Sequence, residues 1–175
     1  MADKKAVIFC SSHDLEQKYI QAARTIVRAA CLAGYDIVSG GTVKGLMGHV
    51  CDEAAQCDAE VIGVIPRFMK GLEHPALSEC VWTDTMSQRK DGMREGTSLA
   101  IALPGGIGTL DELAETYCLA KMGLYGGRVV AYNMEGFYDP LKEQLKTFVD
   151  RGFLYEESLR LISFPETMEE LESLL

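Results

Sequence analysis

Short apolar runs alternate with longer amphipathic stretches along this chain. The runs are rich in β-branched residues, as strands are. They are Ala6–Cys10, Asp36–Ser39, Glu60–Ile65, Cys80–Trp82, Ser98–Leu103 and Arg128–Ala131. Because strands and helices alternate in this way in α/β proteins, the pattern predicts an α/β fold with a mostly parallel sheet flanked by helices.

Helical periodicity fills the stretches between these runs. From Leu15 to Ala33 apolar residues recur every three or four positions, and Gly34 follows as a predicted C-terminal cap. Asp139, which precedes a proline, predicts a helix that starts with a side-chain cap and ends at Gly152. Thr167 with a glutamate three residues later predicts a capping box that opens a last short helix.

Residues 66–79 form the longest stretch without helical or strand periodicity, and they include two prolines and a glycine. Loops of this length in compact domains tend to be functional. We therefore expect this loop to form one wall of a site.

Length and charge limit the classes of protein that the chain can represent. Its 175 residues fit a single domain, 1–175, that buries most of its apolar surface. The formal net charge of -9 argues against a nucleic-acid partner, because binding of a phosphate backbone draws on a surplus of Lys and Arg. A small phosphorylated ligand stays compatible with this charge, since backbone amides and one or two cations can hold one phosphate.

The six cysteines form no CxxC pair, and the first residues lack the apolar core of a signal peptide. We expect reduced thiols and a cytoplasmic protein. His13, His49 and His74 are scattered without ligand spacing, so no metal site is expected. No apolar run is long enough to span a bilayer, so no membrane partner is expected either.

Two glycine-rich segments, 39–48 and 104–109, each follow a predicted strand and precede a predicted helix. A helix N-terminus presents unpaired amides and a partial positive charge, and missing side chains let an anion approach the backbone. Each segment alone is equally compatible with a tight turn that needs positive φ. Their joint presence favours a phosphate pocket at the carboxyl ends of the strands. The candidate contacts are Gly41, Gly45, Gly105, Gly106, Ile107, Gly108 and Thr109.

Thr109 and Glu112 allow two interpretations. Thr109 can cap the helix while Glu112 completes a capping box, which is a purely structural role. Alternatively, the Thr109 hydroxyl donates to a phosphate and the Glu112 carboxylate faces the ligand. Glu115 lies three residues further on, on roughly the same helical face.

Arg89 and Lys90 lie just upstream of the strand that ends at the second glycine turn. On a helix they point about 100° apart, so one can reach the pocket while the other turns away. The guanidinium of Arg89 offers a planar fork that grips a phosphate or stacks on a purine. The alternative is a solvated basic pair on a surface helix.

Three motifs together resemble the LOG family of cytokinin riboside 5'-monophosphate phosphoribohydrolases, many of whose bacterial members were once labelled possible lysine decarboxylases. They are a PGGxGTxxE run from Pro104 to Glu112, an RKxxM run from Arg89 to Met93, and a GGxxxGLMG run from Gly40 to Gly48. The resemblance extends over nearly the whole chain.

This resemblance implies a Rossmann-like, doubly wound fold and a homodimer with the site near the subunit interface. The implied reaction is hydrolysis of the N-glycosidic bond of a nucleoside 5'-monophosphate of adenine or N6-modified adenine, as in an AMP nucleosidase. By motif, Arg89 and Glu112 match the catalytic pair of the family. Lys90 and the Gly106–Thr109 turn match nucleotide contacts, and Glu73 in the 66–79 loop matches a glutamate that touches substrate.

The residues themselves fit this chemistry without a metal or an organic cofactor. Cleavage of a ribosyl–purine bond builds positive charge on the sugar, which a carboxylate such as Glu112 can stabilise. Arg89 has an electrostatic or positional role, because it is too basic to donate a proton readily. The main alternative is a nucleotide carrier or sensor without catalytic activity on the same fold. A pyridoxal-phosphate decarboxylase would need a buried lysine, which the amphipathic helices do not predict.

Overall fold

The computed structural model describes residues 4–175 and contains one seven-stranded sheet in which all neighbouring strands run parallel. The strand order is β4-β3-β2-β1-β5-β6-β7. Their bounds are β1 Lys4–Phe9, β2 Tyr35–Ser39, β3 Val61–Pro66, β4 Glu79–Thr83, β5 Thr97–Ala102, β6 Arg128–Ala131 and β7 Ile162–Ser163. The α/β fold with a parallel sheet is thereby confirmed.

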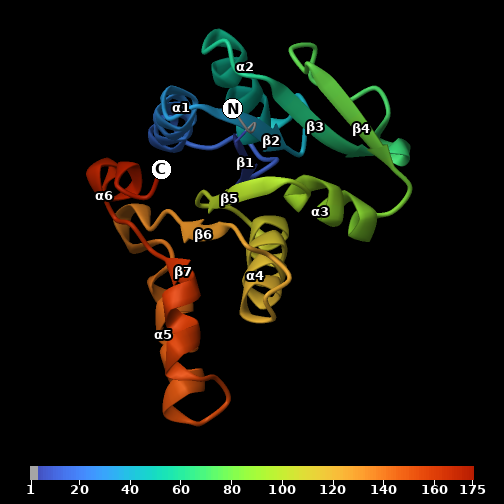
Figure 1. Cartoon of the computed structure of the whole chain (residues 1–175). Helices are drawn as coiled ribbons and strands as arrows, with labels where there is room; N and C mark the ends of the chain where they lie inside the picture. The colour runs from blue at the N-terminus through green and yellow to red at the C-terminus, as the bar shows by residue number, and fades with distance from the viewer. Residues whose placement is uncertain (1–3) are drawn as a thin grey trace.

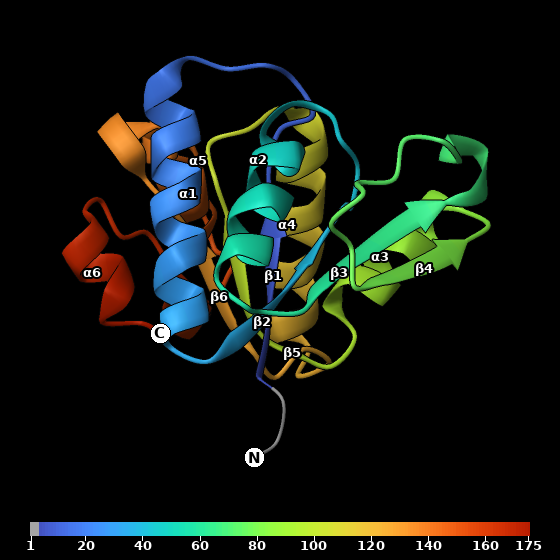
Figure 2. The same cartoon turned by 90° about the horizontal axis from the view of Figure 1, so that it is seen from above.

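Helices cover both faces of the sheet (Figures 1 and 2). The face that includes Ile8 and Ile101 packs against α1 (Gln17–Leu32), α2 (Gly45–Gln56) and α6 (Met168–Glu172). The face that includes Val7 and Ala100 packs against α3 (Met86–Arg94), α4 (Ile107–Lys121) and α5 (Asp139–Asp150). Alternate side chains of β1 and β5 thus pack into two separate cores, one on each face of the sheet. Because helices cover both faces, the fold is doubly wound.

The order of the strands fixes where a ligand can bind. The side on which successive strands are added to the sheet changes at β1, because β2 and β3 lie on one side of it and β5 and β6 on the other. In open α/β sheets ligands bind at such a switch point, outside the carboxyl ends of the strands. The β1–α1 and β5–α4 connections, of which the second is the Pro104–Gly106 turn, flank this point (Figure 2).

Most predicted elements are confirmed, with shifts of a few residues at their ends. Gly34 and Gly152 adopt positive φ angles of 84° and 78° directly after α1 and α5. The hydroxyl of Thr167 accepts a hydrogen bond from the Glu170 amide, as a cap of α6. Strand β7 was not predicted, because a strand of two residues has no readable period.

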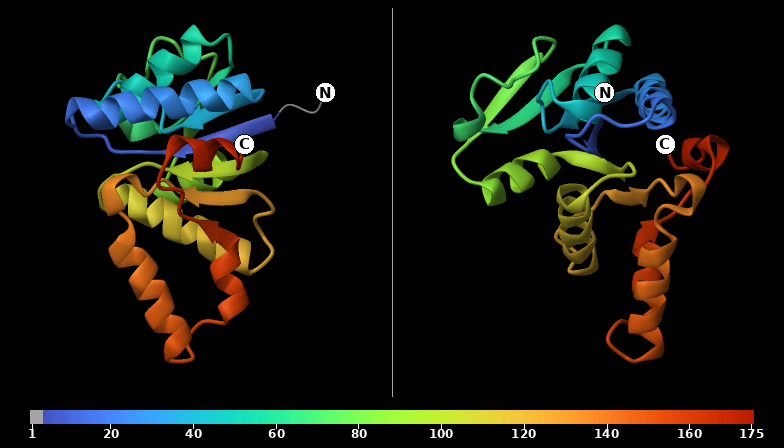
Figure 3. Two further views of the ribbon diagram at one scale, coloured as in Figure 1. Left: turned by 90° about the vertical axis from the view of Figure 1, so that its left-hand side faces the viewer. Right: turned by 180° about the vertical axis from the view of Figure 1, so that it is seen from behind.

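The predicted side-chain cap at Asp139 is wrong. Tyr138 occupies the N-cap position of α5, and Asp139 is already inside the helix. The Asp139 carboxylate instead accepts a hydrogen bond from the side-chain amide of Asn133, at 2.8 Å. Helix α5 extends away from the main body as an arm (Figure 3).

The remaining features concern loops and cysteines. The 66–79 loop begins with one 3-10 turn, Arg67–Met69, and then returns to β4. All six cysteines are free. No helix within residues 4–175 combines the length and the apolar character that a bilayer span requires.

Candidate active site

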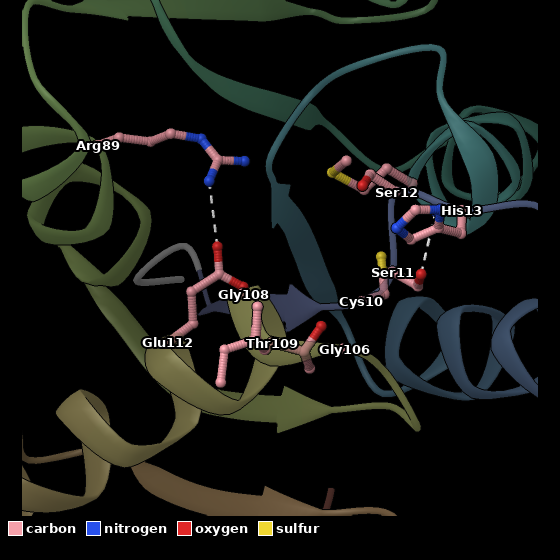
Figure 4. Close-up of a pocket in the computed structure, with 11 residues that line it drawn as sticks. Cys10, Ser11, Ser12, His13, Arg89, Gly106, Gly108, Thr109 and Glu112 are labelled. Carbon is pink, nitrogen blue, oxygen red and sulfur yellow. Dashed lines mark hydrogen bonds and ion pairs between the residues drawn. The ribbon is translucent and has the colours of Figure 1, made fainter.

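A pocket of about 220 Å³ opens at the switch point, at the carboxyl edge of the sheet (Figure 4). Four segments build it: the loop after β1, the helix α2, the helix α3, and the N-terminal half of α4 with the turn before it. Its lining residues are Cys10, Ser11, Ser12, His13, Met47, Arg89, Gly106, Ile107, Gly108, Thr109 and Glu112. The structure thus brings Arg89, Glu112 and the second glycine turn together, as the sequence predicted.

Arg89 and Glu112 form a buried ion pair on one wall of this pocket. Nη1 of Arg89 lies 3.1 Å from Oε1 of Glu112, and the two side chains are only 8% and 10% exposed. Nε of Arg89 donates a second hydrogen bond to the carbonyl oxygen of Val64, at 3.0 Å. Two hydrogen bonds therefore hold the guanidinium of Arg89 in place. The one to Glu112 in turn holds that carboxylate at the wall of the pocket.

Burial changes the acidity of the groups in the pocket. It raises the pKa of Glu112 from 4.5 to about 7, although Arg89 acts in the opposite direction. Burial, with a smaller contribution from Glu112, also raises the pKa of the Cys10 thiol. A carboxyl group whose pKa lies near neutrality is suited to general acid–base chemistry.

The N-terminal turn of α4 lines the pocket. Gly106 is the N-cap and has no side chain, and the first intrahelical bond runs from the Leu110 amide to the Gly106 carbonyl. The preceding amides have no partner within the helix. A Cβ on Gly105 would lie 2.3 Å from Oγ1 of Thr109, so the close approach of Thr109 requires glycine there.

The capping-box interpretation of Thr109 and Glu112 is wrong. Because α4 begins at Ile107, Thr109 lies at its third position and Glu112 at its sixth. Glu112 is therefore too far along the helix to reach the N-cap amide. Its partner is Arg89, and its role is not that of a cap.

The first glycine turn packs against residues that line the pocket. A Cβ on Gly40 would lie 2.1 Å from Nη2 of Arg89, so this glycine makes room for the guanidinium. Gly45 packs against the backbone of Ser12 and His13, and Gly41 packs against Gly63. Neither Gly41 nor Gly45 lines the pocket, and their contact with a substrate stays a prediction.

Lys90 turns away from the pocket into a bridge between α3 and α4. Its Nζ lies 3.0 Å from Oδ2 of Asp111 and 3.0 Å from Oε2 of Glu115. The buried Arg94 pairs with the same Glu115 oxygen at 3.0 Å and with Asp91 at 2.6 Å. Glu115 thus faces this bridge, and contact of Lys90 with a nucleotide stays a prediction.

The 66–79 loop packs on the first glycine turn. Glu73 pairs with Thr42 in an antiparallel bridge, and its carboxylate accepts a hydrogen bond from the Gly71 amide at 2.5 Å. Hydrogen bonds from its own backbone amide and, second, from the Gly71 amide hold the pKa of Glu73 below its ordinary value. The loop does not line the pocket, so contact of Glu73 with a substrate also stays a prediction.

Comparison with known proteins identifies the family. The family model described as "Possible lysine decarboxylase" matches residues 47–175. The cytokinin riboside 5'-monophosphate phosphoribohydrolase LOG of Oryza sativa subsp. japonica is 33% identical over 96% of this chain and 71% of its own length. The chain belongs to the LOG family.

Other LOG-family relatives match over similar lengths. The cytokinin riboside 5'-monophosphate phosphoribohydrolase LOG2 of Arabidopsis thaliana is 31% identical over 98% of this chain and 82% of its own length. The cytokinin riboside 5'-monophosphate phosphoribohydrolase of Mycobacterium tuberculosis is 29% identical over 87% of this chain and 82% of its own length.

Solved structures share the fold. A molybdenum cofactor binding protein from Rippkaea orientalis superposes with a TM-score of 0.73 and 19% identity, over 99% of this chain and 96% of that chain. The molybdenum cofactor carrier protein from Chlamydomonas reinhardtii gives a TM-score of 0.71 and 17% identity, over 97% and 94%. The fold of this chain is therefore also the fold of a molybdenum cofactor binding protein and of a molybdenum cofactor carrier protein.

The sequence did not point to the loop after β1 as part of this LOG-family site. Cys10 to His13 line the pocket opposite Arg89 and Glu112 (Figure 4), and Met47 of α2 also belongs to the lining. Their position directly after the first predicted strand was the available signal, because that strand lies beside the switch point.

Proposed function

We propose that this chain hydrolyses the N-glycosidic bond of adenine or N6-modified adenine nucleoside 5'-monophosphates. The products are the free base and ribose 5-phosphate. One observation carries the proposal: a buried carboxylate, Glu112, is held 3.1 Å from Arg89 in the pocket that also receives the N-terminus of α4. The names of the LOG-family relatives support the same substrate class.

Each part of the pocket has a role in this reaction. The amides at Gly106–Thr109 hold the 5'-phosphate, since a helix N-terminus is a ready anion site. Glu112 stabilises the positive charge that develops on the ribose and takes a proton from the attacking water. Arg89 orients Glu112 and contributes electrostatically, because a guanidinium stays charged. Binding of the remote phosphate supplies energy that orients the sugar.

A carrier or sensor of nucleotides is the second candidate, favoured by the structural neighbour that is named a molybdenum cofactor carrier protein. The two functions make different demands on Glu112. A carrier does not need a carboxylate with a pKa of about 7 in its pocket.

Incubation with AMP and with isopentenyladenosine 5'-monophosphate separates the two candidates. The enzyme interpretation predicts release of free base, measured by chromatography, by the wild type and at least about a hundredfold slower by Glu112→Gln. Calorimetry checks that the variant still binds the nucleotide. Tight binding by both proteins with no base released by either would favour the carrier.

A further inference from the structure

Departure of an adenine base requires a proton that the Arg89–Glu112 pair does not supply. A purine anion is a poor leaving group, so protonation of a ring nitrogen eases cleavage of its bond to C1'. In the proposed function Glu112 acts as a carboxylate toward the sugar and the water. A second group is therefore needed on the side of the base.

Four residues with ionisable side chains line the pocket within the part of the chain that the structure describes: Cys10, His13, Arg89 and Glu112. Arg89 stays charged and pairs with Glu112. The Cys10 thiol is buried and holds its proton firmly, because burial raises its pKa. His13 is the one that remains.

The position of His13 fits a proton donor to the base. Its ring lies across the pocket from Arg89 and Glu112 (Figure 4). It also lines an adjacent, mostly apolar hollow of about 270 Å³ that shares Ser11 and Gly106 with the pocket. Tyr19 and Phe137 line that hollow, and aromatic rings of this kind are suited to contact a purine. His13 lines both cavities, so a base bound where they meet lies next to its side chain.

The backbone holds His13 in this place. Its amide donates to Oγ of Ser11 at 3.0 Å, and its carbonyl oxygen packs against Gly45 at the start of α2. The side chain itself is exposed, so solvent can return a proton after each turnover. Histidine is the side chain most often used for such proton transfer.

We propose that His13 is the general acid of the reaction, an inference that rests on the proposed function. The bond between C1' and N9 breaks and leaves its electron pair on the base, while the His13 imidazolium gives its proton to a ring nitrogen of the base. Water bonds to C1' and passes a proton to the Glu112 carboxylate. Solvent then protonates His13 and deprotonates Glu112, so the net change is the consumption of one water.

The test compares two leaving groups in the variant His13→Gln. With AMP, kcat falls at least about a hundredfold, the usual scale for a positioned general acid. With 4-nitrophenyl ribofuranoside 5-phosphate, whose nitrophenolate leaves without a proton, the rate equals that of the wild type. If that compound is not cleaved, AMP methylated on N7 replaces it, because its base leaves as a neutral molecule. His49→Gln, a change on α2 outside the pocket, leaves both rates unchanged.

Other outcomes overturn the inference in distinguishable ways. An unchanged AMP rate in His13→Gln, or an equal loss on both leaving groups at an unchanged melting temperature, removes His13 as the acid and leaves the hydrolase standing. Absence of base release by the wild type from every nucleotide removes the proposed function and this inference with it.

Discussion

Replacement of Arg89 by glutamine tests how the ion pair controls the ionisation of Glu112. The two side chains are buried and 3.1 Å apart, and with Arg89 in place the pKa of Glu112 is about 7. An adjacent guanidinium lowers the pKa of a carboxyl group by about 1–3 units. Without it, the pKa of Glu112 rises to roughly 8–10.

The change in ionisation sets the size of the effect. At pH 7 the ionised fraction of Glu112 falls from about one half to between roughly one tenth and one thousandth. Ionisation alone then lowers kcat at pH 7 by about 5-fold to about 500-fold. Because the carboxylate is the active form, the acid limb of the pH profile moves to higher pH together with the pKa of Glu112.

The assay is kcat for AMP as a function of pH, measured for the wild type, Arg89→Gln and the control Arg151→Gln at the C-terminus of α5. The control keeps the acid limb of the wild type near pH 7. An acid limb that stays in place in Arg89→Gln, whatever the overall loss of rate, would refute the coupling between Arg89 and Glu112.

Three further predictions concern Glu112 and two residues that lie around the site, Gly40 and Glu115. Because the pKa of Glu112 is raised from 4.5 to about 7 in the folded state, the free energy of unfolding falls as pH rises through that window, by about 3 kcal/mol. Glu112→Gln removes this loss, so by calorimetry it melts above the wild type at alkaline pH but not below about pH 5. Gly40→Ala places a Cβ 2.1 Å from Nη2 of Arg89, so it costs about 1–3 kcal/mol in urea unfolding and lowers kcat more than binding. Glu115→Gln weakens the bridge to the buried Arg94, and urea unfolding shows a loss of about 1–3 kcal/mol.

The changes at Gly40 and Glu115 each have a matched control. Gly126→Ala adds a Cβ with no atom nearby, and it leaves both stability and kcat unchanged. Glu166→Gln removes an ion pair with Lys142 whose partners are 57% and 38% exposed, and its effect stays below about 1 kcal/mol. Equal effects in a variant and its control, or a Glu112→Gln protein that melts below the wild type at pH 8, would contradict the corresponding argument.

The sheet was predictable because its strands are long and apolar. Runs such as Leu99–Leu103 are buried on both faces, and burial of that kind leaves a continuous apolar signal. The two-residue β7 has no such signal. The predicted cap at Asp139 was wrong for a different reason. Its carboxylate accepts a hydrogen bond from the Asn133 side chain, and local sequence does not reveal that contact.

The site was predictable in part. The pairing of Arg89 with Glu112 followed from two motifs that each lie beside the switch point, and the structure brings them together. The direction in which the Lys90 side chain points could not be predicted from the sequence. It is set by ion pairs with Asp111 and Glu115 on another helix. His13 lies in a loop without periodicity, so only the position of the loop in the sheet order places it at the pocket.

The central claim is that Glu112 lies in a hydrolytic site, and one measurement tests it most directly. Free adenine and ribose 5-phosphate are quantified together over time, in a buffer without inorganic phosphate, for the wild type and Glu112→Gln with AMP or its isopentenyl derivative. We predict equimolar release of both products by the wild type, and loss of release with retained nucleotide binding in the variant. Equal release by the two proteins, or binding without any release by the wild type, would contradict it.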